Sequence, residues 1–178
     1  MAMTTAVMFI DGGCRPTNPG HAAFAAVISL DRPKLNGPSV SEHVISRYIG
    51  WASNNVAELT ALIVGTKYAG YLGAERLEVF SDSKLVVEQT HGRWRLRSDE
   101  LRPLVLEARE LLFKHFPGAW ELTWVPREKN MAADRYCGQA IQAGRHANPW
   151  LRKFLKDNSP GKIIDPFART RDQGSGRA

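Results

Sequence analysis

The chain has 178 residues, of which 43% are hydrophobic and 24% are charged, as is usual for one globular domain. No apolar run reaches the roughly 18–20 residues that a membrane-spanning helix requires, so a membrane protein is excluded. The first ten residues contain no basic segment and no small-residue cleavage site, so we expect no signal peptide. Two cysteines are too few for a disulfide framework, and we therefore expect a reduced, cytoplasmic setting.

The net charge of +6 is unevenly distributed along the chain. Residues 145–178 contain eight basic and three acidic residues, so the rest of the chain is almost neutral. Past Gly144 the apolar periodicity also gives way to proline and glycine. The sequence therefore predicts a catalytic domain over residues 1–144 and a basic C-terminal extension over 145–178 that is partly flexible.

The first third of the domain has the pattern of an antiparallel meander. The apolar run over residues 6–10 predicts a buried strand that ends at Asp11-Gly12-Gly13, where the sequence favours a turn. Strands over residues 22–30 and 41–50 follow with short connections.

The hydrophobic period then changes to three and four residues, which indicates helices. The elements expected in this part are helices over 55–72, 83–90, 98–116 and 131–143, and strands over 77–80 and 120–125. This order predicts an α/β fold in which helices flank a five-stranded mixed sheet whose first three strands are antiparallel.

Four carboxylates stand at the ends of these elements, and each also has an ordinary structural explanation. Asp11 suits a turn, and Glu58 suits a capping box with Asn55. Asp82 suits a helix N-cap, and Asp134 an exposed charge in a first helical turn. Because two follow strands and two begin helices, the topology is able to bring all four to one edge of the sheet.

A cluster of four carboxylates predicts a particular chemistry. Crowded carboxylates raise one another's pKa unless a cation neutralises them, and Mg²⁺ prefers such oxygen ligands. Two such ions can stabilise the attacking and leaving oxygens of a phosphoryl displacement. No catalytic triad, P-loop or dinucleotide-binding fingerprint competes with this interpretation.

Four sequence blocks resemble class I ribonuclease H in content and in order. They are Asp11-Gly12-Gly13 with Asn18-Pro19-Gly20, Asn54-Asn55-Val56-Ala57-Glu58, Ser81-Asp82-Ser83, and Val125-Pro126-Arg127-Glu128-Lys129-Asn130 with Ala133-Asp134. The last block resembles the archaeal and plant-like subgroup of this type 1 family. The resemblance extends over roughly residues 4–143.

The resemblance implies a ribonuclease H-like fold and a metal-dependent endonuclease that hydrolyses the RNA strand of RNA–DNA hybrids, leaving 3′-hydroxyl and 5′-phosphate ends. Asp11 would bridge two Mg²⁺ ions, for which Mn²⁺ substitutes in the family. Asp134 would help to hold the ion that activates water, and Glu58 and Asp82 would hold the ion at the leaving oxygen. We expect a monomer whose partner is the hybrid and which does not contact a membrane.

The resemblance also implies a set of substrate contacts, some of which have structural alternatives. The set comprises Gly13, Cys14, Asn18, Asn54, Asn55, Trp94, Arg127 and Asn130. The asparagines before Glu58 also suit helix capping, and Cys14 also suits packing. Trp94 stands among three arginines in the segment 91–97, an arrangement that suits contacts with nucleic-acid phosphates. The alternative is that the Trp94 side chain packs into the core.

Two features depart from the family pattern. Many relatives have a histidine in the loop after the last strand, where this chain has Arg127-Glu128-Lys129, and nothing in the sequence places His91 or His146 near the metals. The second feature is the basic tail, which we expect to add affinity for nucleic acid without being required for chemistry.

Two other functions are consistent with the same fold. A catalytically silent nucleic-acid-binding module would be expected to lack at least one of the four acids, and all four are present. A proofreading exonuclease would be expected to show Asp-x-Glu in the first strand, where this chain has Asp11-Gly12-Gly13.

Overall fold

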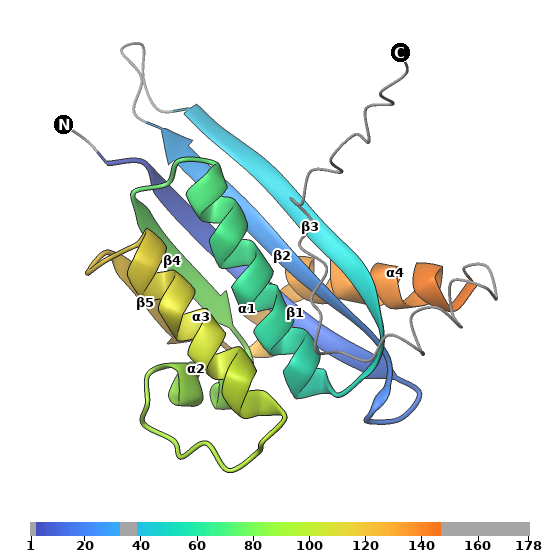
Figure 1. Cartoon of the computed structure of the whole chain (residues 1–178). Helices are drawn as coiled ribbons and strands as arrows, with labels where there is room; N and C mark the ends of the chain where they lie inside the picture. The colour runs from blue at the N-terminus through green and yellow to red at the C-terminus, as the bar shows by residue number, and fades with distance from the viewer. Residues whose placement is uncertain (1–2, 33–38, 147–178) are drawn as a thin grey trace, which may run out of the picture.

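The described residues, 3–32 and 39–146 of a computed structural model, form one mixed sheet with helices on both faces (Figure 1). The strand order is β3-β2-β1-β4-β5. β1 pairs antiparallel with β2 and β2 with β3, whereas β4 runs parallel to β1 and β5 parallel to β4. The strands are β1 (Thr5–Arg15), β2 (Gly20–Arg32), β3 (Ser39–Ala52), β4 (Arg76–Ser81) and β5 (Trp120–Trp124). The predicted sheet and its antiparallel opening are confirmed.

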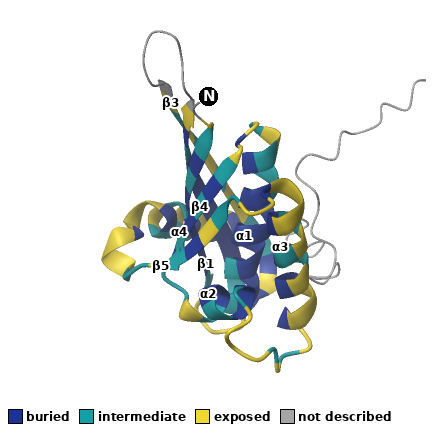
Figure 2. Ribbon diagram, turned by 90° about the vertical axis from the view of Figure 1, so that its left-hand side faces the viewer, coloured by how far each residue is buried: buried dark blue, intermediate teal, exposed yellow. Residues whose placement is uncertain are grey.

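The helices divide between the two faces of the sheet. They are α1 (Asn54–Tyr71), α2 (Lys84–Thr90), α3 (Leu101–His115) and α4 (Met131–His146), with a 3₁₀ turn, η1 (Arg127–Lys129), before α4. Side chains alternate along β2, so that Ala22, Phe24 and Ala26 belong to the main core under α1 and α3. Ala23 and Ala25 are on the opposite face, where they pack against residues of α4. Figures 1 and 2 show α4 on the other side of the sheet from α1 and α3.

β1 is longer than the sequence indicates, because it continues through the predicted turn to Arg15. Asp11 lies within the strand opposite Ala25, and the pairing with β2 extends to Arg15 and His21. This pairing satisfies the backbone hydrogen bonds of the glycines that follow Asp11. The prediction that the strand ends at Asp11-Gly12-Gly13 is therefore wrong.

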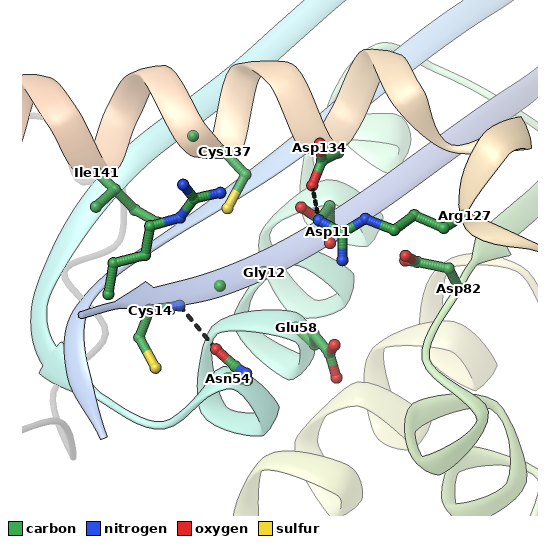
Figure 3. A pocket seen from close by; sticks show the side chains of 13 residues that line it. Asp11, Gly12, Cys14, Asn54, Glu58, Asp82, Arg127, Asp134, Cys137 and Ile141 are labelled. Carbon is green, nitrogen blue, oxygen red and sulfur yellow. Dashed lines mark hydrogen bonds and ion pairs between the residues drawn. The ribbon is translucent and has the colours of Figure 1, made fainter. Parts of the chain in front are cut away.

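The close approach of α1 to β1 explains why position 12 is a glycine. A Cβ atom at this position would overlap the backbone of Ala57 and Glu58. Because the backbone of α1 at Ala57 and Glu58 lies directly against β1, Glu58 is beside the segment that carries Asp11 (Figure 3).

We expect Gly12→Ala to lower the free energy of unfolding by about 3 kcal/mol, because the added methyl group must displace backbone rather than a flexible side chain. Urea denaturation measures this change. Gly138→Ala is the matched control: a Cβ there meets open space within α4, so the replacement should stabilise the protein by about 0.5–1 kcal/mol. A Gly12→Ala variant as stable as the original protein would contradict the close approach.

Serine residues cap the two helices that begin near the candidate acids. Ser53 Oγ accepts from Val56 N at the start of α1, and Ser83 Oγ accepts from Val86 N at the start of α2. The capping roles considered for Asn55 and Asp82 are therefore wrong. Neither Glu58 nor Asp82 therefore caps the N-terminus of a helix.

The basic extension predicted over residues 145–178 lies outside the described residues, apart from the end of α4. Among residues 3–32 and 39–146, no helix combines the length and the apolar character needed to cross a membrane.

Candidate active site

One pocket at the edge of the sheet is lined by all four candidate carboxylates (Figure 3). Asp11 projects from β1 and Asp82 directly follows β4, which is the parallel neighbour of β1. Glu58 reaches the pocket from α1 on one face of the sheet, and Asp134 from the first turn of α4 on the other. Residues far apart in sequence therefore converge as the topology predicted.

Burial and mutual repulsion disfavour the charged forms of two of these acids. Asp11 is 8% exposed, and burial together with the charges of Asp82 and Asp134 raises its pKa to about 6. Burial also raises the pKa of Glu58 to about 7, with Asp11 and Asp82 adding to the shift. The Oε2 atom of Glu58 is buried and has no hydrogen-bond partner among the described residues. The pocket is thus short of positive charge.

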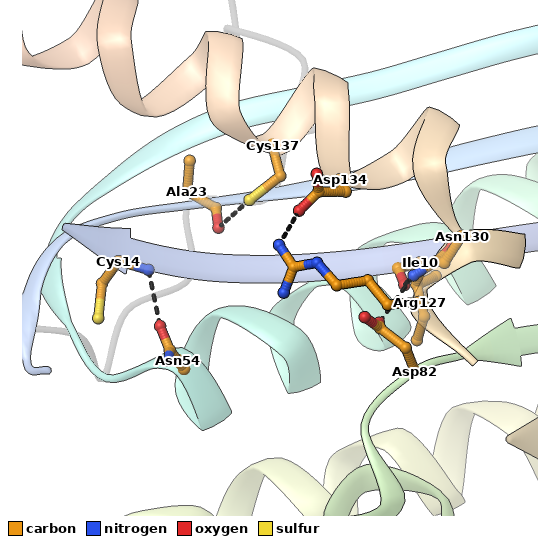
Figure 4. A network of polar contacts seen from close by, with 9 residues as sticks. All are labelled: Ile10, Cys14, Ala23, Asn54, Asp82, Arg127, Asn130, Asp134 and Cys137. Atoms are coloured by element: carbon orange, nitrogen blue, oxygen red, sulfur yellow. Dashed lines mark hydrogen bonds and ion pairs between the residues drawn. The ribbon is translucent and has the colours of Figure 1, made fainter. Parts of the chain in front are cut away.

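Arg127 supplies part of that charge. Its guanidinium group forms an ion pair with Asp134 and lowers the pKa of Asp11 (Figures 3 and 4). The side chain of Arg127 is 68% exposed, so it reaches into the pocket from the solvent side. It stands in the loop after β5, and its role as a substrate contact stays a prediction.

Asn130 is buried beneath the carboxylates rather than exposed to a ligand. It is 1% exposed, and its Nδ2 atom donates to Ile10 O and to Asp82 Oδ1, each at 2.8 Å (Figure 4). The contact with the substrate that the resemblance implies for Asn130 stays a prediction, and the burial of its side chain favours a structural role.

The other candidate substrate contacts next to the site form a network at the start of α1. Asn54 Oδ1 accepts from Cys14 N at 2.7 Å, and Asn54 N donates to Asn18 Oδ1 at 3.1 Å. Cys14 Sγ donates to Thr17 O at 3.1 Å. Gly13, Cys14 and Asn54 line the pocket, whereas Asn18 and Asn55 stand outside it. Their contacts with substrate stay predictions.

The segment after α2 lies apart from the pocket lining. Trp94 is 48% exposed, so the alternative in which it is tucked into the core is wrong. Arg93 is held by two hydrogen bonds to Glu88, at 2.6 and 2.8 Å, which leaves Arg95 and Arg97 as the arginines beside Trp94. His91 Nε2 is hydrogen-bonded to Leu122 O, away from the carboxylates.

Three pocket residues on α4 were not found from the sequence. Cys137, Gly138 and Ile141 line the pocket at helical spacings of three, four and seven from Asp134, and this spacing was the available signal. Cys137 Sγ donates to Ala23 O at 3.2 Å, and burial raises the pKa of its thiol well above the usual range. Cys137 therefore holds α4 against the sheet as an uncharged thiol.

The residues of the pocket fit a hard divalent cation by the chemistry of their donors. All four acids offer carboxylate oxygens, and one of these oxygens, on Glu58, is buried with no hydrogen-bond partner in the described part of the chain. In the present side-chain conformations, the described part of the chain contains no group of three histidine, cysteine, aspartate or glutamate side chains close enough together to coordinate one ion. Arg127 is paired with Asp134 in this arrangement.

Comparisons with known proteins agree with the geometry. The model of the family described as reverse transcriptase-like matches residues 9–140. The bifunctional protein Rv2228c of Mycobacterium tuberculosis is 37% identical over 159 residues, which are 89% of this chain and 40% of that protein. The chain thus spans about 40% of the length of the first curated relatives that it matches.

Solved structures that are 30% or more identical to this chain share its fold. RNase H1 from the archaeon Halobacterium salinarum has a TM-score of 0.66 at 35% identity, covering 78% of this chain and 98% of that one. LC11-RNase H1, in complex with an RNA/DNA hybrid, has a TM-score of 0.66 at 30% identity, covering 78% and 97%. The chain therefore belongs to the reverse transcriptase-like family and, within it, to the type 1 ribonuclease H group that includes the archaeal enzyme.

Proposed function

We propose that this protein is an endonuclease that hydrolyses the RNA strand of an RNA–DNA hybrid and leaves 3′-hydroxyl and 5′-phosphate ends. The observation that carries the proposal is the convergence of four carboxylates from four separate segments on one pocket. The complex of the related LC11-RNase H1 with an RNA/DNA hybrid supports the choice of substrate. We further propose a monomer that works in the cytoplasm.

Ribonucleases H depend on divalent metal ions, and we propose two Mg²⁺ ions here, with Mn²⁺ as a substitute. Asp11, Glu58, Asp82 and Asp134 would hold them. The bound ions supply activation of the attacking water and stabilisation of the leaving 3′-oxygen. Asp11 has the central place among the ligands, because its charge acts on Glu58 and is itself acted on by Asp82 and Asp134.

Arg127 and the residues around Cys14 would bind the substrate. A guanidinium group that pairs with a carboxylate pairs equally well with the oxygens of a phosphate. The backbone at Gly13 and Cys14 borders the pocket without bulky side chains, so a nucleic-acid strand can approach it closely. The 2′-hydroxyl group, which distinguishes RNA from DNA, is the substrate atom that must be recognised there.

We expect Arg127→Ala to raise the KM for the hybrid about tenfold with a smaller change in kcat, because a phosphate contact binds ground state and transition state alike. The slope of log affinity against log salt concentration should fall by about 1. Steady-state cleavage and binding over a salt series measure both quantities. Lys129→Ala is the control, since Lys129 is an exposed cation of the same turn that does not line the pocket. A lost kcat at unchanged KM would contradict a substrate contact.

The proposed function is tested with three duplexes of one sequence: RNA–DNA, RNA–RNA and DNA–DNA, each incubated in Mg²⁺ with and without EDTA. We expect cleavage of the RNA strand of the hybrid, with 3′-hydroxyl ends, and its loss in EDTA. Equal cutting of the DNA duplex, or cutting that survives EDTA, would overturn the proposal. Binding of the hybrid without cleavage would instead identify a silent nucleic-acid-binding module.

A further inference from the structure

Asn130 stands between η1 and α4, where its side chain is buried among three of the segments that form the pocket (Figure 4). Its Nδ2 atom donates to Ile10 O and to Asp82 Oδ1, both at 2.8 Å. Ile10 directly precedes Asp11 in β1. A single amide nitrogen therefore joins the main chain beside one candidate metal ligand to the carboxylate of another.

The main chain of Asn130 extends this connection to the third acid. Asn130 O accepts from Asp134 N at 3.1 Å, which starts the hydrogen-bond ladder of α4. Asn130 N donates to Arg127 O at 2.9 Å and so closes η1. Asn130 is thus in contact with the segments that carry Asp11, Asp82 and Asp134, whereas Glu58 is placed separately by the approach of α1 to Gly12.

The contacts of the side chain explain why an amide is needed at this position. Ile10 O and Asp82 Oδ1 are both acceptors, so the group between them must supply two N–H donors without a negative charge. A serine would supply one donor, an alanine none, and an aspartate would place a further carboxylate against Asp82. The Oδ1 atom of Asn130 is buried and has no hydrogen-bond partner among the described residues. The two N–H groups of Nδ2, rather than the carbonyl oxygen, therefore explain why an amide side chain stands here.

We propose that Asn130 is a positioning residue, which fixes the carboxylate of Asp82 relative to Asp11 and thereby sets the affinity of the pocket for divalent cations. This inference rests on the proposed function. Asn130 makes no contact with the substrate in this role, because its side chain is enclosed by the protein. Partners that orient ligating carboxylates typically contribute 10–100-fold to metal affinity or activity.

The test measures Mg²⁺ binding by calorimetry and, separately, kcat and KM for the hybrid at saturating Mg²⁺. We expect Asn130→Ala to weaken Mg²⁺ binding about 10–100-fold and to lower kcat, with KM for the hybrid unchanged. Asn130→Ser keeps one donor and disturbs the fold less, so it should fall between the alanine variant and the original protein. A crystal structure of the metal-free serine variant should show the Asp82 side chain turned from its present orientation.

Leu112→Ala is the control for a loss of stability alone, because Leu112 is fully buried in α3 and does not line the pocket. It should lower the melting temperature and leave the Mg²⁺ affinity unchanged. Asn130 variants that bind Mg²⁺ as tightly as the original protein would overturn the inference, whatever their melting temperature. A raised KM at unchanged kcat and metal affinity would also overturn it, in favour of a substrate contact. Failure of the original protein to bind Mg²⁺ or to cleave hybrid would instead overturn the proposed function.

Discussion

Asp11→Asn is expected to lower the rate of hybrid cleavage by about 10³-fold or more while the protein folds and binds hybrid as before. Asparagine has the shape of aspartate, so the packing of β1 against α1 and α4 is kept. It lacks the negative charge, and the other three acids surround this position. Replacing Asp11 therefore removes the proposed metal ligand that has the central place among the four acids.

Single-turnover cleavage in Mg²⁺ measures the first effect, and fluorescence anisotropy with labelled hybrid measures the second. Asp99→Asn is the matched control, because the side chain of Asp99 is fully exposed and does not line the pocket. That variant should cleave at the original rate. Near-normal cleavage by Asp11→Asn would remove Asp11 from the mechanism.

Glu58→Gln is expected to stabilise the metal-free protein at pH 8 by about 3 kcal/mol while abolishing cleavage. The pKa of Glu58 is about 7 in the folded protein and near 4.5 in the unfolded chain. A raised carboxyl pKa means that the folded state binds the proton more tightly, so ionisation of Glu58 costs stability as the pH rises from about 4.5 to above 7. At about 1.36 kcal/mol for each pKa unit, glutamine removes a penalty of about 3 kcal/mol.

Urea denaturation in EDTA at pH 8 and at pH 4 measures this difference. The gain should be present at pH 8 and nearly absent at pH 4, where the carboxyl group of Glu58 is mostly protonated in both states. Glu110→Gln, at an exposed position of α3, should give no such pH-dependent gain. If Glu58→Gln and the original protein were equally stable at pH 8, the expected cost of ionising Glu58 in the folded protein would be contradicted. Mg²⁺ should stabilise the original protein more than the variant, since ligands of the folded state add their binding free energy.

The sequence predicts the architecture well because each element carries a local signal. The apolar run over residues 6–10 and the three- and four-residue spacing after Asn55 depend only on neighbouring positions. The order of strands and helices then limits the possible sheets, and the predicted mixed sheet is the one observed. Asp82 and Asp134 meet at the pocket for the same reason, since Asp82 follows β4 and Asp134 stands in the first turn of α4, whereas Asp11 lies within β1 and Glu58 within α1.

The errors occur where a residue's role depends on a distant partner. Asp11-Gly12-Gly13 has the local signal of a turn, but pairing with β2 and the approach of α1 extend the strand instead. Nothing local shows that Asn130 is a buried donor, because its acceptors are 120 and 48 residues away in the sequence. Ser53 and Ser83, which cap α1 and α2, compete with equally good capping residues beside them.

The packing of α4 has a consequence for how the site is lost. α4 rests on the sheet through a small cluster of Ala23, Ala25, Cys137 and Ile141, whereas α1 and α3 share the main core. Local opening of a helix requires only the free energy of its own contacts, which here is much less than that of the whole domain. Detachment of α4 would carry Asp134 away while the strands stay folded. We therefore expect the packing of α4 on the sheet to determine the fraction of molecules in which all four acids are in place. Heating should abolish activity at a lower temperature than it unfolds the sheet.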